Sequence, residues 1–454
     1  MNKKLLAQIL LLLAISVTAL KASEPDTAFN NQFRKDIGGW IAADATYSIH
    51  LPDNRTLWLF GDTFIGEVNG ISIVNGSKFI RNSAVIQDGN DLQTLHGGTS
   101  GAPDDYLRTQ HPDSTWYWPE HGIVENDTLR IIVAKFRHAD NGTEGFNFAH
   151  AGNDIANLTW PGLEFINAVP LEAHAINGVI YGDRILVDTG YVYIYGRKND
   201  PDNFNIPYPH MARTTEGNIM DQSSWEYYDG TGWSSDPAAS KSFQDIPVSQ
   251  QYSVTTYMGK YILLTQNIWL SPEIFTYVSD TPTGPWKNKT KVYTTPETSG
   301  STFTYNAYAH PQFNKNNELL ISYNVNGDFW SVFSNVELYR PQFIRVPYRN
   351  ISFAFWTGSA NESITSSQLV KIYPNPVHNL SKLSMEIKES GVLSWELIDM
   401  QGRLIASREA TWIGAGRHRL EIRNDAVKSG YYILRIKHEN KTVSTPVMIS
   451  INTE

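Results

Sequence analysis

The chain contains no cysteine among its 454 residues. This absence excludes a disulfide framework, thiolate metal sites, iron–sulfur clusters and a cysteine nucleophile. The 12 histidines occur without the HExxH spacing of zinc hydrolases. The glycine-rich segment 97–101 fits neither a phosphate loop nor a nucleophile elbow, and it predicts a flexible loop. We recognise no ligand set for a metal, and we expect neither a metal nor a cofactor.

Hydrophobic residues make up 41% of the chain and aromatic residues 12%, with 32 glycines and 22 prolines. This composition is globular and rich in turns, and the length exceeds one average domain. The first 22 residues have a basic start at Lys3 and Lys4, an apolar run from Leu5 to Leu20 and small residues at its end. They predict a secretory signal peptide over residues 1–22. The alternative, a membrane anchor, needs about 20 apolar residues, and the run is shorter.

A turn followed by an apolar strand occurs five times between residues 24 and 358, with intervals of roughly 65 residues between strand starts. No helical period accompanies these strands. The pattern predicts an all-β five-bladed β-propeller over residues 24–358, and a two-sheet sandwich is the alternative. The strands start at Leu57, Leu129, Tyr191, Tyr261 and Leu319.

The tail after a linker at residues 359–368 has a different pattern. Residues 369–454 contain short alternating strands, such as Leu393–Asp399 and Ser429–Ile436, separated by glycine turns. They predict a small C-terminal β-sandwich. The Tyr373–Pro376 opening, the Asp399–Gly402 turn and the closing strand resemble the C-terminal sorting domain of type IX secretion. The resemblance implies a Gram-negative, Bacteroidota-type host, the type IX secretion machinery as a partner, and a secreted or outer-surface location. A sugar-binding or adhesive sandwich is the alternative.

The net charge is -9, and residues 24–365 carry the acidic excess. An acidic surface argues against nucleic acid, heparin-like polymers and anionic lipid as partners, and it suits a neutral or cationic ligand. No segment after the signal peptide is long enough to span a membrane.

Polar residues follow each of the five apolar strands, and equivalent repeats would gather them on one rim of the propeller. The preceding strands would add Asp44, Glu120 with His121, Gly182, Tyr252 and His310 to the same rim. Carboxylates, amides and aromatic rings together are typical of a carbohydrate site. Candidates for stacking on sugars are Trp40, Trp116, Tyr117, Trp118, Tyr305 and Tyr308, and we expect the segment 116–120 to be a loop. The strand-end residues are Asp62, Lys135, Arg137, Arg197, Gln266, Asn267, Tyr323 and Asn324.

Asp44 and Asp62 form the sharpest pair, because they lie on the two arms of the first hairpin near its open end. A two-residue turn at Asp53-Asn54 would pair position 44 with 63 and send the two carboxylates to opposite faces. An odd loop or a bulge would align them. The alternative interpretation is that Asp62 only caps a turn after Gly61.

The segments Gly39–Ser48, Arg55–Phe64, Tyr308–Pro311 and Tyr339–Phe343 resemble secreted five-bladed propellers of largely unknown function. That group is similar to glycoside hydrolase family 183, the endo-D-arabinanases, and more distantly to family 43. In family 183 two aspartates of the first blade are implicated in catalysis, and the matching positions here are Asp44 and Asp62. The third carboxylate of family 43 has no secure match, and Glu120 is the nearest candidate.

We therefore expect an exported glycoside hydrolase that acts on a poly- or oligosaccharide with furanosidic, arabinan-like or related linkages. Asp44 and Asp62 are the expected catalytic pair, with their roles and the retaining or inverting outcome open. The alternatives are a glycan-binding surface protein without catalysis and a purely structural adhesin. The expected substrate-binding residues are Trp40, Trp118, Glu120, His310, Tyr323 and Asn324.

Overall fold

The computed structural model divides the chain into two units, Met1–Phe355 and Trp356–Glu454. It describes residues 22–139, 147–203, 205–244, 246–268 and 270–352, together with the strands of the second unit and a few residues beside them. The predicted signal peptide, apart from its last residue, and the predicted linker lie outside the described residues. Among the described residues, no helix is long and apolar enough to cross a membrane.

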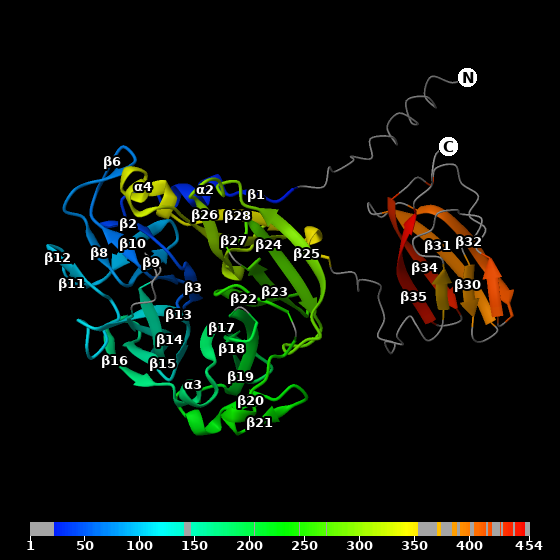
Figure 1. Ribbon diagram of the computed structural model, residues 1–454, viewed down its shortest axis with the longest axis horizontal. Helices are drawn as coiled ribbons and strands as arrows, with labels where there is room; N and C mark the ends of the chain where they lie inside the picture. Colours follow the sequence, from blue (N-terminus) through cyan, green and yellow to red (C-terminus); the bar gives the residue numbers. More distant parts are fainter. Residues whose placement is uncertain are drawn as a thin grey trace, which may run out of the picture. The chain divides into compact units, whose positions relative to one another are not determined.

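Five sheets of four or five antiparallel strands follow one another along the first unit (Figure 1). The sheets are β3 (Tyr47–His50), β4 (Thr56–Phe60), β9 (Ser83–Asp88) and β10 (Asp91–Leu95); β13 (Thr115–Glu125), β14 (Thr128–His138), β15 (Phe148–Thr159) and β16 (Phe165–Pro170); β17 (Ile180–Asp188), β18 (Tyr191–Asp200), β19 (Ile206–Thr215), β20 (Glu226–Tyr228) and β21 (Trp233–Ser234); β22 (Tyr252–Tyr257), β23 (Lys260–Gln266), β24 (Glu273–Ser279) and β25 (Lys287–Thr294); and β26 (Phe303–Ala309), β27 (Glu318–Asn326), β28 (Gln342–Pro347) and β1 (Glu24–Pro25).

The five predicted apolar strands are β4, β14, β18, β23 and β27, and each is the second strand of its sheet. Their central residues are buried because neighbouring sheets cover both faces. One core cluster joins Leu57 of β4 to Ile131 of β14, and another joins Ile262 of β23 to Leu319 of β27. This succession of stacked sheets confirms the β-propeller and sets aside the two-sheet sandwich.

The N-terminal strand closes the ring of sheets. In β1, Glu24 lies opposite Arg345 of β28, so the last sheet takes its fourth strand from the start of the chain. The carboxylate of Asp26 then accepts a 2.7 Å hydrogen bond from Arg345 Nε. Tyr308 of β26 packs in the same core cluster as Tyr47 of β3. Such closure removes the open sheet edges that would otherwise pair with another chain.

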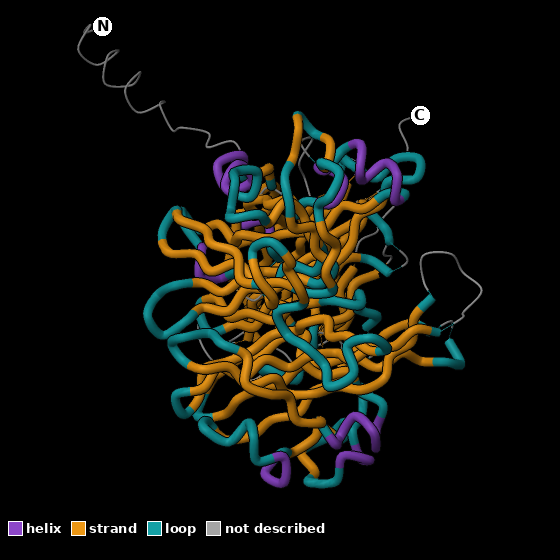
Figure 2. Tube along the Cα trace, turned by 90° about the vertical axis from the view of Figure 1, so that its left-hand side faces the viewer, coloured by secondary structure: helices purple, strands orange, loops and turns teal. Residues whose placement is uncertain are grey.

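Short strands and helices flank these five sheets, and most helices lie toward the ends of the molecule in Figure 2. A small sheet beside the first blade brings together β2 (Trp40–Ala43), β5 (Thr63–Ile65) and β8 (Lys78–Ile80), and it positions the hairpin ends described below. The others are β6 (Val68–Asn69), β7 (Ser72–Ile73), β11 (Gly97–Thr99), β12 (Ala102–Asp104), α2 (Thr27–Gln32), α3 (Glu172–Asn177), α4 (Phe329–Ser334), η1 (Gln222–Ser224), η2 (Pro237–Ala239), η3 (Pro311–Phe313), η4 (Val336–Tyr339) and η5 (Tyr348–Asn350).

The second unit is all β, as the sequence predicts. Its core includes Trp395 and Leu434, which are buried. The Asn-Pro of its opening motif and most of the Asp399–Gly402 turn lie outside the described residues. One sheet holds β29 (Val370–Tyr373), β30 (Ser384–Ile387) and β33 (Gly416–Arg419), and the other holds β32 (Leu404–Ile413), β31 (Gly391–Asp399), β34 (Gly430–His438) and β35 (Lys441–Ile449).

Candidate active site

Of the two turn lengths that the sequence left open, the first hairpin has the odd one. Tyr47 lies opposite Leu59, and the Leu51 N–H donates to the Arg55 carbonyl at 2.9 Å. The loop therefore has three residues, Pro52–Asn54, and Asn54 adopts a left-handed φ of 68°. A three-residue loop that ends in a left-handed residue is a common hairpin connection, and asparagine tolerates that conformation well. The sequence left a two-residue turn and an odd loop both open, because sequence alone does not fix a loop length to within one residue, and the structure has the odd loop.

With an odd loop, Asp44 and Asp62 come opposite each other. The Asp44 N–H donates to the Asp62 carbonyl at 3.2 Å, and the Gly61 N–H donates to the Asp44 carbonyl at 3.0 Å. A Cβ on Gly61 would lie 2.5 Å from Asp44 Oδ1, so only glycine leaves room for that carboxylate. Asn324 Nδ2 donates to Thr46 Oγ1 at 3.1 Å and so fixes the backbone segment next to Asp44. The hairpin thus presents both carboxylates at one place.

The carboxyl of Asp44 lies below the surface among hydroxyl donors. Tyr305 OH donates to its Oδ2 at 3.3 Å, and Tyr339 forms a further side-chain hydrogen bond to it. Burial and the neighbouring charge of Asp62 raise the pKa of Asp44 to about 8. At neutral pH this group therefore keeps a proton that it can donate.

The partners of Asp62 are N–H donors, and one of them is a cation. Its Oδ1 accepts a 3.0 Å hydrogen bond from Trp118 Nε1, and its Oδ2 lies 3.3 Å from Arg81 Nη1. Burial raises the pKa of Asp62 to about 6, while Arg81 and Trp118 oppose that rise by stabilising the anion. The side chain keeps 15% of its surface exposed, so the carboxylate remains accessible to water or a ligand.

Aromatic rings form a wall next to this pair. The Trp118 ring lies 4.3 Å from that of Phe136 and 5.0 Å from that of Phe148, measured between centroids. The guanidinium of Arg81 lies 4.4 Å above the Trp116 ring. Trp116 is buried, but Trp118, Phe136 and Phe148 remain partly exposed. Exposed aromatic faces beside carboxylates are the arrangement that a sugar-binding site requires.

Segment 116–120 is part of a strand and not a loop, contrary to the sequence-based expectation. It belongs to β13, and the register shifts between Pro119 and Gly122. Proline has no N–H to donate, and a bulge tolerates that loss. As a result, Trp118 lies near the Asp62 end of the strand, whereas Glu120 and His121 lie further along it.

Glu120 contributes to a buried ion cluster away from the aspartate pair. Its Oε1 lies 3.1 Å from Arg197 Nη2, and Arg197 Nη1 lies 2.6 Å from Asp183 Oδ1. Tyr47 OH also donates to Glu120. The side chain of Glu120 is only 4% exposed, so this structure offers it no access to a substrate.

Four other predicted substrate-binding residues are buried and have structural partners. His310 follows the far end of β26 and bonds to Ser48 Oγ and Ser322 Oγ, whereas Tyr305 lies near the start of that strand. Trp40 packs in an aromatic core cluster. Asn324 donates to the Ala43 carbonyl and to Thr46 Oγ1, and so holds the Asp44 segment. Tyr323 OH donates to the carboxylate of Glu297. Of the six residues proposed to bind substrate, the structure places Trp118 beside the aspartates.

Sequence reasoning missed two partners of the pair and one further acid. Arg81 follows β8 and carries no motif that marks it. Tyr339 lies inside the Tyr339–Phe343 segment that carried the family resemblance, so a signal existed there. Asp105 accepts a 2.7 Å hydrogen bond from the Arg81 N–H, and burial raises its pKa. These residues come from distant parts of the sequence, and only folding unites them.

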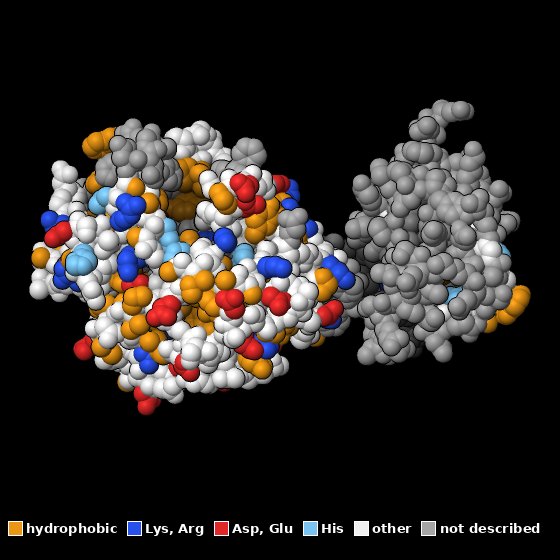
Figure 3. Space-filling view, turned by 60° about the horizontal axis from the view of Figure 1, so that its bottom comes forward, with side chains coloured by type: hydrophobic (Ala, Val, Ile, Leu, Met, Phe, Trp, Pro, Cys, Tyr) orange, Lys and Arg blue, Asp and Glu red, His pale blue; other side chains and the backbone are white. Residues whose placement is uncertain are grey.

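Charges of both signs are interspersed over the face of the first unit that Figure 3 shows, and a hollow there has hydrophobic side chains on its wall. The acidic excess is therefore not a uniform field on this face. Within the part of the chain that the structure describes, no group of three or more His, Cys, Asp or Glu side chains is placed to hold a metal ion.

Comparison with known families gives matches to both units. Residues 26–361 match the "Domain of unknown function (DUF5005)", and residues 371–450 match the "Secretion system C-terminal sorting domain". A sorting domain of this type directs export through type IX secretion, so the protein is secreted or displayed on the outer surface of a Gram-negative bacterium. A search of curated proteins found no match.

Solved structures are similar to this chain at low sequence identity, and one of them, with a TM-score of 0.61, shares the fold. A Bacteroides ovatus protein described as a "putative hydrolase" is 21% identical, with a TM-score of 0.61 over 74% of this chain and 92% of that chain. A GH43_1 enzyme from Xanthomonas citri complexed with xylose is 15% identical, with a TM-score of 0.38 over 71% and 93%. A xylan beta-1,4-xylosidase from Bacillus halodurans is 8% identical, with a TM-score of 0.40 over 90% of each chain.

Similarity at these identities describes the fold and leaves the chemistry to the site itself. The family match is of a different kind, because it covers most of the chain and all five sheets of the first unit. By that match, this exported β-propeller protein belongs to the DUF5005 family.

Proposed function

We propose that the protein is a glycoside hydrolase that uses Asp44 and Asp62 as its carboxylate pair. One observation carries the proposal: the odd hairpin loop brings the two aspartates opposite each other at a partly exposed position and gives them unlike partners. Hydrolysis of a glycosidic bond needs two such groups, one that gives a proton and one that activates water or attacks the sugar.

The unlike partners support a division of roles. Asp44, with tyrosine hydroxyls and no cation among its hydrogen-bond partners, is the general acid. Asp62 is the base or nucleophile, because Arg81 and Trp118 favour its ionised form. Pairs whose surroundings separate their pKa values are typical of acid and base assignments. Trp118 also serves as the aromatic platform beside the reacting sugar.

The substrate class rests on the resemblance of the first hairpin to family 183. We propose furanosidic, arabinan-like or related linkages in a neutral poly- or oligosaccharide. We further propose that residues 1–22 act as a signal peptide in a Bacteroidota-type host, and that the propeller has five blades corresponding to the five sheets.

The test is release of reducing ends by the full mature chain on arabinans, arabinogalactans, xylans and fructans. We expect product from one class, with arabinans first. Binding of a glycan without any product from it would replace the hydrolase with a glycan-binding surface protein. Neither binding nor product on the whole panel would overturn the carbohydrate assignment.

A further inference from the structure

A cavity lies at the opposite ends of β3 and β13 from the aspartate pair. Its volume is about 800 Å³, within the range of small-molecule sites. His50, at the end of β3, and Glu125, at the end of β13, line it. By contrast, Asp44 precedes β3 and Trp118 lies near the start of β13. The cavity and the aspartate pair are therefore separate.

Arg184 is the unusual residue of this cavity. It is 8% exposed, and among the described residues it has no carboxylate within ion-pair distance. Its Nε has no acceptor among the described residues, and the other partners of its guanidinium are uncharged, the His121 ring nitrogen at 3.1 Å from Nη1 and the Tyr308 hydroxyl. A buried cation without an anion is costly in a folded protein, because desolvation is not offset by a partner.

The neighbouring imidazole does not supply the missing acceptor. His121 faces two donors, the Ile185 N–H at 3.3 Å and Arg184 Nη1 at 3.1 Å, and one acceptor, the Ser48 carbonyl at 3.0 Å. A neutral imidazole has one donor and one acceptor. Whichever tautomer is present, the imidazole accepts from only one of these two donors.

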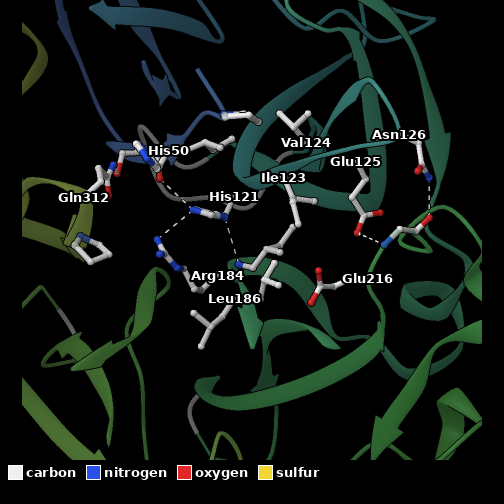
Figure 4. A pocket seen from close by; sticks show the side chains of 18 residues that line it. His50, His121, Ile123, Val124, Glu125, Asn126, Arg184, Leu186, Glu216 and Gln312 are labelled. Atoms are coloured by element: carbon white, nitrogen blue, oxygen red, sulfur yellow. Dashed lines mark hydrogen bonds between the residues drawn. The ribbon is translucent and has the colours of Figure 1, made fainter. Parts of the chain in front are cut away.

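The acidic side chains near this cavity lie away from Arg184 or are bonded to other groups. Glu125 and Glu216 are on the other side of the cavity from Arg184 and His121 (Figure 4). Both oxygens of Glu125 already accept from the N–H groups of Gly217 and Ile219. Glu120 and Asp183 are bonded to Arg197. Three of these carboxylates are therefore bonded to other groups, and the fourth, Glu216, lies on the far side of the cavity.

Much of the remaining lining is aliphatic, and Arg184 is the arginine among the described residues that line it. Val124, Leu186 and Val187 are among the aliphatic side chains that line the cavity. We propose that this cavity binds a small organic carboxylate, with the carboxylate on Arg184 and an apolar body against the aliphatic wall. The guanidinium group favours a carboxylate over other anions by its planar shape, and such a ligand would supply the missing negative charge. This site is independent of the proposed hydrolase activity.

Calorimetric titration of the full mature chain with sodium hexanoate tests the proposal, with 1-hexanol and sodium acetate as probes that lack the charge or the apolar body. We expect saturable hexanoate binding that exceeds the affinity for either probe by at least about tenfold, the size of one good polar or apolar contact. Chloride at high concentration should weaken it. No hexanoate binding, or equal binding of hexanol, would overturn the proposal.

Two variants locate the binding. Arg184→Met keeps the shape of the side chain without its charge and should abolish hexanoate binding. Val187→Trp should block the cavity from an exposed position, since Val187 is 45% exposed, and it keeps the assay decisive if Arg184→Met does not fold. Glu216→Gln, on the far side, is the control and should retain binding. Undiminished hexanoate affinity in a folded Arg184→Met or Val187→Trp protein would place the ligand elsewhere and refute the site.

Discussion

Two pairs of carboxylates in the first unit, Asp44 with Asp62 and Glu120 with Asp183, differ in their access to water. Asp44 and Asp62 lie at the partly exposed end of a hairpin, with tyrosine, tryptophan and a half-exposed arginine around them. Glu120 and Asp183 are 4% and 0% exposed, and both bond to Arg197. Burial alone would lower the pKa of Arg197, but the two carboxylates raise it.

The difference teaches that residue type does not identify a catalytic acid. A carboxylate that is locked to a buried guanidinium holds the fold together, and its removal leaves an uncompensated charge. A carboxylate with a raised pKa, weak cationic support and contact with water is available for proton transfer. Each of the following experiments breaks or sharpens this contrast.

The largest expected effect is the loss of activity when either member of the aspartate pair is replaced. Asp62→Asn and Asp44→Asn should each lower kcat by about 10³-fold or more on the substrate identified above, because each removes a proton-transfer group or nucleophile. Reducing-end assays with an unfolding curve for each variant measure this. Asp53→Asn, at the other end of the same hairpin, is the matched control. Retention of more than a tenth of the parent activity in both folded variants would contradict the assignment.

The second effect is on stability at the buried cluster. Arg197→Met should lower the free energy of unfolding by about 3–5 kcal/mol, because Glu120 and Asp183 would keep their burial and lose their cation. Arg55→Met removes a surface pair with Asp53 and should cost about 1 kcal/mol or less. Urea unfolding of the full chain compares the two. Similar losses would mean that the buried cluster contributes no more than a surface pair.

Asp44→Asn should raise the free energy of unfolding at pH 8, by less than Arg197→Met lowers it. The pKa of Asp44 is about 8 in the folded protein and 3.8 ordinarily, so the folded state retains a proton that the unfolded chain releases. Stability from this group is full below pH 3.8 and falls as the pH rises toward 8. Asn removes this dependence and should stabilise by roughly 1–3 kcal/mol at pH 8, and by little at pH 4. A variant that is destabilised at pH 8 would show that the carboxyl supports the fold.

The smallest effect concerns the pH profile. With Asp62 ionising near pH 6 and Asp44 near pH 8, kcat/KM should be bell-shaped with its maximum between those values. Trp118→Phe removes the Nε1–H donor to Asp62. The pKa of Asp62, and with it the acidic limb of the pH profile, should therefore rise by roughly half a unit. An unchanged acidic limb would show that Asp62 is not the group that titrates there. The same experiment on Trp160→Phe serves as a control away from the pair.

The sequence anticipated the strands better than the loops and the partners. The apolar runs at Leu57, Leu129 and Leu319 became second strands, because a segment that is apolar on both faces needs cover on both sides. Asp62 was identifiable from its position after such a strand. Trp118 was also expected at the site, although its segment proved to be a strand.

The errors have a common origin in register. One residue in the loop at Pro52–Asn54 decides whether Asp44 and Asp62 share a face, and a left-handed Asn54 supplies that residue. The length of β13 placed Glu120 inside the channel, and His310 follows the far end of β26. A period of two residues makes each such shift reverse the direction of a side chain.

By itself the sequence determined the all-β class, the repeating units, the export tail and the residues of the aspartate pair. These follow from composition, period and motif, which are local properties of the chain. Only the tertiary structure decided that Arg81, Tyr305 and Tyr339 surround that pair, that Arg197 binds Glu120, and that Arg184 Nε has no acceptor among the described residues. The physical reason is that burial and charge pairing depend on which distant segments meet, and the pKa of a carboxyl follows from that meeting.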